Sequence, residues 1–279
     1  MEHWVKDDFY DYRILPDYLA LKENSKNINS LSKSFSDVVR NLDKESNSKW
    51  VLRNYLSARL ILASSVLLTS ADYAVGKNVR IVEPYLYYYS LLNCARAVAF
   101  TNPWVNGDDL FTMTHEKTIN VVCDHIIKYD KEKGAYIKDF INKAKSFREL
   151  YSYRLPTKGI QHFKQSFSEV VEICTVLAEL AQLQSAVLER TFNKNGNGHF
   201  ELDIDIMSKA FYYNDISIFD EEDFYRVNYL ARKNPRPLSI INTMTEGWVE
   251  DYFGGWCADE DLDMSYNPDQ NWRIIFNVP

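Results

Sequence analysis

The segment from residue 81 to residue 100 constrains the fold more than any other part of the sequence. Pro84 stands near its start, where the first turn of a helix tolerates proline. Tyrosines and aliphatic residues then recur at helical spacing, and the opposite face of the same helix is apolar too. A helix that is apolar on nearly all sides belongs at the centre of a bundle. The segment therefore predicts a central helix from Tyr85 to Phe100.

Arg96 lies in the middle of this apolar helix. A guanidinium keeps its proton even when it is buried, so at this position it requires an acidic partner or an anionic ligand. The candidate partners are Asp72, Glu116 and a bound phosphate. We expect Arg96 and His115 to lie near one polar pocket, where the central helix meets the loop before His115.

Helical periods with short connections predict that residues 48–192 form one helical bundle. Residues 1–47 are expected to pack against it, with 24–36 as a loop or a weak helix. Gly134 is expected to break the helical pattern. The expected helices span residues 48–74, 84–101, 113–129, 135–153 and 161–192.

The segment 193–198, rich in asparagine and glycine, is the clearest break in the sequence. After it, residues 199–206 alternate polar and apolar side chains as a strand does, and residues 272–278 are a second strand candidate. The sequence therefore predicts a mainly α protein, in which the helical bundle carries a smaller, acidic α+β region at residues 199–279.

The charge is unevenly distributed along the 279 residues, whose formal net charge is −7. Residues 199–279 hold 16 acidic and 6 basic residues, a net charge of −10, and residues 1–198 hold 23 acidic and 26 basic residues, a net charge of +3. This asymmetry indicates either two regions with different partners or two regions that dock on each other.

Several function classes lack their sequence signatures. There is no glycine-rich phosphate loop, no Gly-x-Ser-x-Gly turn and no His-Glu-x-x-His motif, and the four cysteines lack the spacing of metal ligands. We therefore expect no metal and no cofactor, and we expect the cysteines to be buried thiols. The N-terminus resembles no secretory signal, and we find no apolar run of membrane-spanning length, so we expect a cytoplasmic protein.

A basic stretch covers residues 117–164, with a net charge of +6 and interleaved tyrosines. Such a stretch could follow the phosphate backbone of RNA or DNA. It could equally form solvated helix faces or the docking site of the acidic C-terminal region. The candidate nucleic-acid-binding residues are Lys128, Lys131, Lys133, Lys138, Lys143, Lys145 and Arg148.

An acidic segment rich in aromatic residues covers residues 246–263. Aromatic anchors within an acidic rim are typical of a protein interface, so a protein partner is expected there. The alternative is a turn that faces the core and has a solvated acidic edge.

Arg154, His162 and His115 are the candidate catalytic residues. An arginine and a histidine that lie close together can cleave a phosphodiester without a metal, because the histidine moves protons and the arginine stabilises the charge on the phosphorane. The structural alternatives are that His115 caps a helix and that Arg154 binds the carbonyls at a helix C-terminus.

Three segments carry a family resemblance: residues 83–100, the Thr114-His115 pair, and Leu150-Tyr-Ser-Tyr-Arg154. Together they resemble YaaC-like proteins and the wider HEPN superfamily (higher eukaryotes and prokaryotes nucleotide-binding) over about residues 48–190. The resemblance implies a HEPN-like helical bundle, often dimeric, found in bacterial toxin–antitoxin and anti-phage systems. Many members are metal-independent RNases in which four to six residues separate an arginine from a histidine.

This chain departs from that spacing, because seven residues separate Arg154 from His162 and eight separate Arg190 from His199. The leading expectation is therefore a HEPN-like subunit, non-catalytic or atypical, that binds a partner protein, a nucleic acid or both in bacterial defence. A homodimer is also expected from the resemblance. The alternative is a metal-independent RNase toxin that uses Arg154 with His162 or His115.

Overall fold

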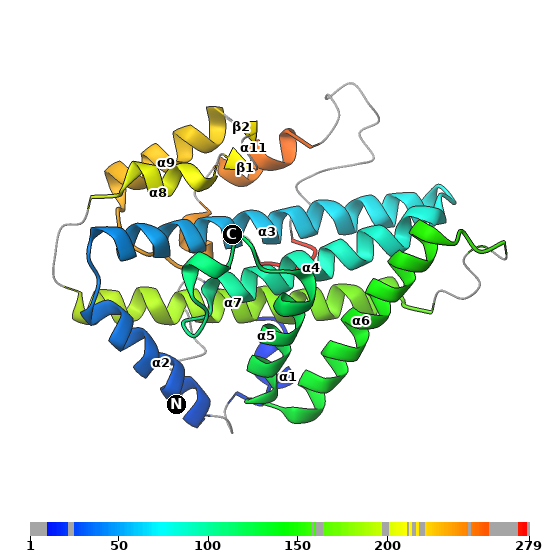
Figure 1. Cartoon of the computed structure of the whole chain (residues 1–279), viewed down its shortest axis with the longest axis horizontal. Coiled ribbons are helices and arrows are strands. Elements are labelled where there is room, and N and C mark those ends of the chain that lie inside the picture. Colours follow the sequence, from blue (N-terminus) through cyan, green and yellow to red (C-terminus); the bar gives the residue numbers. More distant parts are fainter. Residues whose placement is uncertain are drawn as a thin grey trace.

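The protein is mainly helical (Figure 1). The computed structural model describes residues 10–21, 25–157, 159, 164–196, 201–210, 212–213, 216–217, 221–244, 247–256 and 273–277. The helices are α1 (Leu15–Tyr18), α2 (Ser25–Arg40), α3 (Lys44–Gly76), α4 (Glu83–Thr101), α5 (His115–Ile127), α6 (Lys131–Tyr153), α7 (Phe167–Asn195), α8 (Ile204–Met207), α9 (Glu221–Lys233), α10 (Ile240–Thr243) and α11 (Trp248–Gly254). Three 3₁₀ turns (Arg80–Val82, Gly107–Asp109 and Ser208–Ala210) and two short strands, β1 (Tyr212–Tyr213) and β2 (Ile216–Ser217), complete the described elements.

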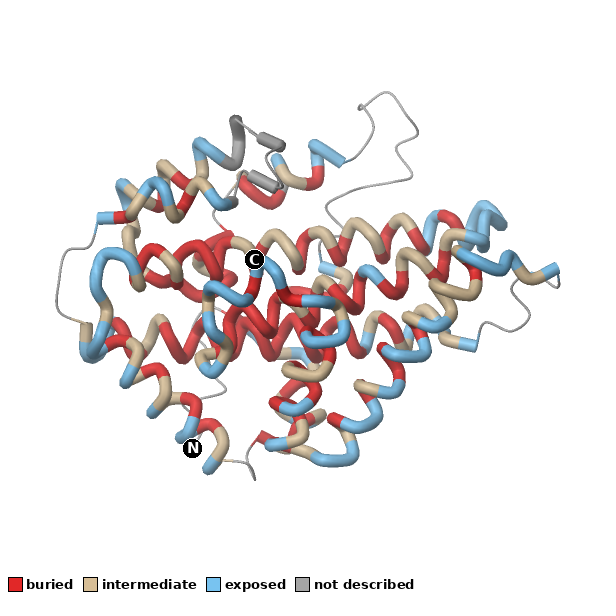
Figure 2. The backbone as a smooth tube through the Cα atoms, viewed as in Figure 1, coloured by how far each residue is buried: buried red, intermediate tan, exposed pale blue. Residues whose placement is uncertain are grey.

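Helix α4 lies at the centre of the bundle, as its sequence predicts. It packs against α3 and α7, and the α5–α6 hairpin packs on it as well. Tyr87, Tyr88 and Leu91 on α4 are buried, and Cys94 and Ala95 one turn later have no exposed surface at all. Small side chains on this helix let the neighbouring helices approach closely. The helices at the centre of the bundle, α4 among them, are largely red in Figure 2.

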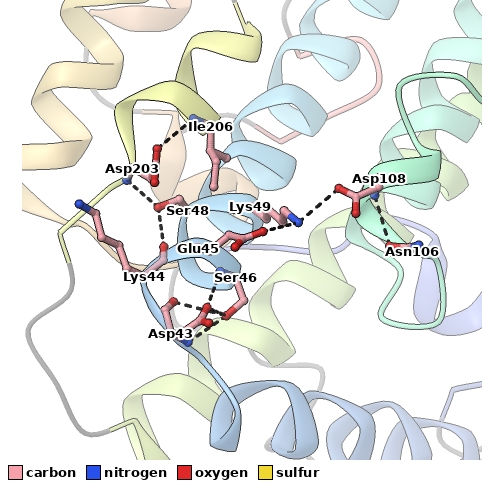
Figure 3. A network of polar contacts seen from close by, with 10 residues as sticks. All are labelled: Asp43, Lys44, Glu45, Ser46, Ser48, Lys49, Asn106, Asp108, Asp203 and Ile206. Atoms are coloured by element: carbon pink, nitrogen blue, oxygen red, sulfur yellow. Dashed lines mark hydrogen bonds and ion pairs between the residues drawn. The ribbon is translucent and has the colours of Figure 1, made fainter.

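The N-terminus of α3 binds two segments that are distant in the sequence (Figure 3). Asp43 accepts a hydrogen bond from the Ser46 N–H at 2.8 Å, and the Ser46 hydroxyl accepts one from the Asp43 N–H at 2.9 Å, which is a capping box. One turn later, Lys49 pairs with Asp108 of the loop after α4 at 3.3 Å. The Asp203 N–H donates to the Ser48 hydroxyl at 2.8 Å, which fixes the segment before α8.

Polar side chains on the deeply buried helix α7 anchor both ends of the chain. The Glu179 carboxylate accepts three backbone N–H groups, from residues 13–15 at the start of α1, at 2.6 to 3.2 Å. In the C-terminal region, the Ser185 hydroxyl accepts from the Ile240 N–H, and the Gln182 side-chain carbonyl accepts from the Ile241 N–H, each at 3.0 Å. These bonds satisfy N–H groups that a helix start leaves without an internal partner.

The C-terminal segments share one continuous hydrophobic core with the bundle. The Trp248 ring of α11 stacks on Tyr55 of α3, with 5.3 Å between the ring centroids. Helices α8, α9 and α11 lie on one side of α3, and α5 and α6 lie on the other (Figure 1). The described part of the acidic region thus contacts α3 and α7 and does not dock on α5 and α6.

The strand prediction was wrong at the positions that the structure describes. Within 199–206, Ile204 already begins α8, because Asp203 caps its N–H groups. Residues 273–276 form turns and a bend. The described strand pair is β1 with β2, in which Tyr212 pairs with Ser217 in an antiparallel register. An α+β character for the whole C-terminal region stays a prediction.

Residues 25–40 form a full helix, α2, which is the helical alternative expected for residues 24–36. The expectation for Gly134 needs correction. Gly134 lies inside α6 and does not break it. A Cβ atom at Gly134 would lie 2.6 Å from Ile127 Cγ1 and 2.8 Å from the Ile127 backbone nitrogen. The glycine therefore permits close contact between α5 and α6 at their turn.

Helices α3 and α7 are long and apolar enough, by length and composition, to cross a membrane, although we expected no such run. Most residues of both windows are buried inside the bundle. Core helices of a soluble protein have the same properties, so this finding is weak support for a membrane span.

Candidate anion-binding site

The first turn of α5 lies where α4 and α6 meet. Thr114 is the N-cap of α5, and its hydroxyl accepts a hydrogen bond from the Lys117 N–H at 3.2 Å. His115 follows as the first residue of the helix. A short connection joins α5 to α6, and the two helices form a hairpin. Helix α5 has 13 residues and α6 has 23 residues, so α6 is the longer of the two. The start of α5 therefore faces the second half of α6.

His115 contacts two tyrosines of α4. Its Nδ1 atom lies 2.9 Å from the Tyr88 hydroxyl oxygen, and the direction of this hydrogen bond depends on the tautomer of the ring. The Tyr89 ring meets the His115 ring edge-on, with 6.3 Å between the centroids. The Tyr88 side chain is buried, whereas Tyr89 is 38% exposed. Tyr88 thus holds His115 on its buried side, while the Tyr89 side chain beside it is exposed to solvent.

The charges of three cations act on this histidine, and we call Arg96, His115, Lys145 and Arg148 the cationic cluster. Partial burial lowers the pKa of His115, and the positive charges of Arg96, Arg148 and Lys145 lower it further. Both effects favour the neutral form of the imidazole. The charged side chains that shift this pKa are all cations, and Glu149, 3.6 Å from Arg148, compensates part of their charge.

Arg148 is the most firmly held cation of the cluster. Its Cζ atom lies 5.2 Å from the centroid of the Tyr88 ring, and its side chain is 14% exposed. Glu149 is its carboxylate neighbour, at a long separation of 3.6 Å. The Arg148 Nε atom is buried and has no hydrogen-bond partner. A guanidinium that is largely buried and incompletely paired is a costly arrangement, and an anionic ligand would offset that cost.

The structure brings Arg96 and His115 together, but it does not bury Arg96. The Arg96 side chain is half-buried at the edge of α4. Among the described residues it makes no ion pair, so neither Asp72 nor Glu116 serves as its partner. The cost argument from a fully buried guanidinium was therefore wrong for this residue.

Arg53 is the guanidinium that the fold buries, and sequence reasoning missed it. Its Nε and Nη2 atoms donate to the carbonyls of Phe100 and Asn102 at 2.5 and 2.6 Å, and Nη1 donates to the Val105 carbonyl at 3.3 Å. Its Cζ atom lies 3.8 Å from the centroid of the Trp50 ring. Burial lowers the pKa of Arg53 to about 9, which leaves it charged at pH 7. Arg53 thus caps the C-terminus of α4, and its place on the apolar face of α3 was the available signal.

The predicted catalytic pair is not assembled among the described residues. Arg154 is the C-cap of α6 and is exposed. His162 lies outside the described residues. The arginines whose charges act on His115 are Arg96 and Arg148.

Most of the seven predicted nucleic-acid-binding residues have separate local roles. Lys128 lies over the Trp104 ring, and Lys133 lies over the Tyr18 ring. Lys143 is exposed and pairs with Asp139 at 2.5 Å. Lys131 is exposed near the start of α6, Lys138 lies close to Cys123, and only Lys145 and Arg148 join the cationic cluster.

Other predicted features are partly covered by the structure. Cys94, Cys123 and Cys174 are buried and free, as expected, and Cys257 lies outside the described residues. The described residues hold no group of three side chains suited to a metal ion. In the acidic segment 246–263, Trp248 and Phe253 are buried against the bundle, whereas Trp256 is 69% exposed. Residues 257–263 are not described, and the protein partner stays a prediction.

Comparisons of this chain with protein-family models, curated proteins and solved structures give no match. The interpretation of the site therefore depends on the geometry of the cationic cluster.

Proposed function

We propose that this protein binds single-stranded RNA through the cationic cluster. The observation that carries the proposal is the contact of both His115 and Arg148 with Tyr88, where the positive charges of Arg96 and Lys145 also act on the histidine. Cations of this kind bind phosphate, and Arg offers several donors in a fixed plane. The exposed ring of Tyr89 adds a surface on which a base can stack. Phosphate contacts beside an exposed aromatic ring are the usual means of binding single strands.

The choice of RNA over DNA, and a setting in bacterial defence or a toxin–antitoxin system, come from the sequence resemblance to the HEPN superfamily. The burial of both apolar helices supports a soluble protein. In this proposal the protein is a binding subunit, and its contact with a partner protein and its pairing as a homodimer are separate predictions.

The test is fluorescence anisotropy with a labelled single-stranded oligoribonucleotide, titrated at several salt concentrations. Each phosphate contact that is lost should weaken binding and reduce the slope of log K against log salt by about 0.7. We expect Arg96→Gln and Lys145→Gln to show this loss. Lys143→Gln is the matched control, because Lys143 is on the same helix but is exposed and paired with Asp139.

The outcome that contradicts this proposal is wild-type protein that fails to bind RNA even at low salt. Equal weakening by Lys143→Gln and Lys145→Gln would also contradict it, because binding would then depend on overall charge and not on the cluster. Thermal unfolding of each variant shows whether a loss of binding reflects a loss of fold.

A second candidate function is metal-independent RNA cleavage by the same cluster. The lowered pKa of His115 favours it, because a general base must be unprotonated at the working pH. In the tautomer whose Nδ1–H donates to the Tyr88 oxygen, Nε2 is free to take a proton from a ribose 2′-hydroxyl. The 2′-oxygen would attack phosphorus, the bond to the 5′-oxygen would break, and that oxygen would take its proton from water. Arg96 and Arg148 would stabilise the charge on phosphorus.

Incubation of the protein with labelled RNA in EDTA separates the two functions. Cleavage that is lost in His115→Gln, while Lys143→Gln retains it, would establish the RNase. Intact RNA that remains bound would leave the protein as a binding subunit. The original alternative, with Arg154 in the catalytic role, predicts instead that Arg154→Ala abolishes cleavage.

A further inference from the structure

We propose that this protein assembles head to tail, so that an apolar patch at one end of the bundle binds the aromatic surface of α9 and α11 on a second copy of the chain. Both surfaces lie outside the cationic cluster, and the proposal is independent of RNA binding.

The apolar patch lies where α3 ends, α4 begins and α6 ends, at the right-hand end of the molecule in Figure 1. The contact of Arg148 with the Tyr88 ring, at 5.2 Å from Cζ to the centroid, holds the second half of α6 beside the first half of α4. Contiguous exposed apolar side chains of this kind mark an interaction surface. The side chains of the patch are 38% to 74% exposed, and we call them the end patch: Val75, Val79, Ile81, Tyr153 and Leu155.

Leu155 has an unusual backbone conformation within this patch. Its φ angle is 38°, in the left-handed region that a leucine rarely adopts, and its side chain is exposed. Strained backbone of this kind is concentrated at functional surfaces. A partner that covers Leu155 would remove from water an apolar side chain that the fold leaves exposed.

The charges around the end patch favour an acidic partner. Glu83 is buried and pairs with Arg80 at 2.6 Å, so Asp72 is the exposed carboxylate of the segments that carry the patch. If the patch met the same patch of a second copy, its cations would face one another, which opposes association. The charged side chains of these segments, 72–83 and 151–157, are Lys77, Arg80, Arg154, Asp72 and Glu83.

The chain itself carries an acidic surface with exposed aromatic side chains, which we call the aromatic surface: Phe224, Tyr225 and Trp256. Arg226 of α9 pairs with Asp251 of α11, and its Cζ atom lies 5.5 Å from the Tyr225 ring centroid, so the two helices present one surface. In the sequence, residues 221–223 directly before Phe224 are all acidic, and four of the five residues 259–263 are acidic. Exposed aromatic side chains are typical of protein interfaces, and the acidic sequence around them complements the cations of the end patch.

The two surfaces of one chain lie apart along α3. Trp248 of α11 stacks on Tyr55, which is 20 residues before Val75 on the same helix. At 1.5 Å per residue, this stretch of helix spans about 30 Å. The contact therefore joins two copies. Because it joins two different surfaces, it leaves one surface of each kind open on every assembly that does not close into a ring.

The test is sedimentation velocity of the full-length protein over a range of concentrations. Wild-type protein should form assemblies whose mass rises with concentration, and higher salt should weaken them because charges contribute to the contact. Ile81→Asp disrupts the end patch and Trp256→Ser disrupts the aromatic surface, so each variant alone should be a monomer. A one-to-one mixture of the two variants should form a dimer and nothing larger, because each pair retains one intact surface of each kind.

Tyr136→Asp is the matched control, because Tyr136 is an exposed aromatic residue on the same helix as Tyr153 and lies 17 residues before it. It should assemble as the wild type does. Leu155→Asp and Tyr225→Ser are second variants of the end patch and the aromatic surface, with the same expected results. Thermal unfolding of each variant shows whether it is folded.

Three outcomes would overturn the proposal. The first is wild-type protein that stays monomeric at every concentration; binding of that monomer to vesicles of phosphatidylcholine and phosphatidylglycerol would then assign the end patch to a lipid surface. The second is a wild-type dimer that persists in Trp256→Ser and is lost in Ile81→Asp, which indicates that the end patch binds itself. The third is a pair of monomeric variants that do not associate when they are mixed.

Discussion

Replacing Arg53 with methionine should destabilise the protein strongly, although no predicted functional residue changes. Arg53 donates to three carbonyls at and beyond the C-terminus of α4, two of them at 2.5 and 2.6 Å. Methionine keeps the apolar stem against Trp50 but removes every donor. A buried carbonyl left without a donor costs about 1–3 kcal/mol, and a desolvated cation–π contact contributes up to about 2 kcal/mol.

Removal of the buried charge also recovers part of its desolvation cost, so these losses do not add fully. We expect the free energy of unfolding to fall by about 3–5 kcal/mol, which is a large share of the 5–15 kcal/mol typical of a folded domain. Urea denaturation followed by tryptophan fluorescence measures this change. Hydrogen exchange should also show faster exchange in the last turn of α4, because that turn loses its cap.

The matched control is Arg40→Met, because the Arg40 side chain is 68% exposed and pairs with Asp37 on the same helix at 3.4 Å. A surface pair of this kind contributes about 0.2–1 kcal/mol. If Arg53→Met costs no more than Arg40→Met, the carbonyls at the end of α4 do not depend on Arg53 and the reasoning fails.

Three further predictions concern buried positions. Burial lowers the pKa of His125 to about 3. Because the unfolded chain binds a proton near pH 6.5 and the folded chain does not, the free energy of unfolding should fall by up to about 1.4 kcal/mol per pH unit between pH 6 and 4. His125→Gln should show a smaller loss when urea denaturation at pH 6 and pH 4 is compared. Gly134→Ala should lower the melting temperature, with a cost of about 1–3 kcal/mol from contact of the new Cβ atom with Ile127. The gain in helix propensity alone predicts a higher melting temperature, and that result would contradict the close packing at the turn between α5 and α6. Glu179→Gln should cost about 2 kcal/mol and speed hydrogen exchange of the Leu15 amide, because a single amide oxygen cannot accept all three N–H groups at the start of α1. Unchanged hydrogen exchange at Leu15 would contradict this role of Glu179.

Much of the helical scaffold was predictable because it depends on local spacing. The apolar pattern from Tyr85 to Phe100 requires burial on nearly all sides, whatever the neighbours are, and the structure places this helix at the centre. The start of α4 at Glu83, beside Pro84, follows from the same local rule. Short segments were harder to predict. Residues 199–206 alternate polar and apolar side chains, but α8 begins within this segment because the Asp203 side chain accepts hydrogen bonds from N–H groups of the first turn of α8.

Some residues of the candidate site could likewise be predicted from the sequence, and others could not. The sequence alone singled out Arg96 and His115, since a charge in an apolar helix and a histidine in the segment that follows it are visible without a fold. It pointed to Arg154, and not to Arg148, as the arginine that acts with a histidine. They are six residues apart on the same basic stretch, and only the packing of α6 against α4 and α5 brings Arg148 to the ring and leaves Arg154 at the exposed end.

The sequence by itself determined the long helices of the bundle from residue 48 onward and the faces that must be buried, because periodicity is a property of neighbouring residues. Only the tertiary structure decided which guanidinium is buried and which is available. Arg53 and Arg96 both lie in apolar helices, but Arg53 meets the open carbonyls of α4 and is satisfied there, whereas Arg96 reaches the edge beside His115. Whether each guanidinium is buried and paired depends on groups that other helices place beside it, and the packing of the whole bundle sets the positions of those groups.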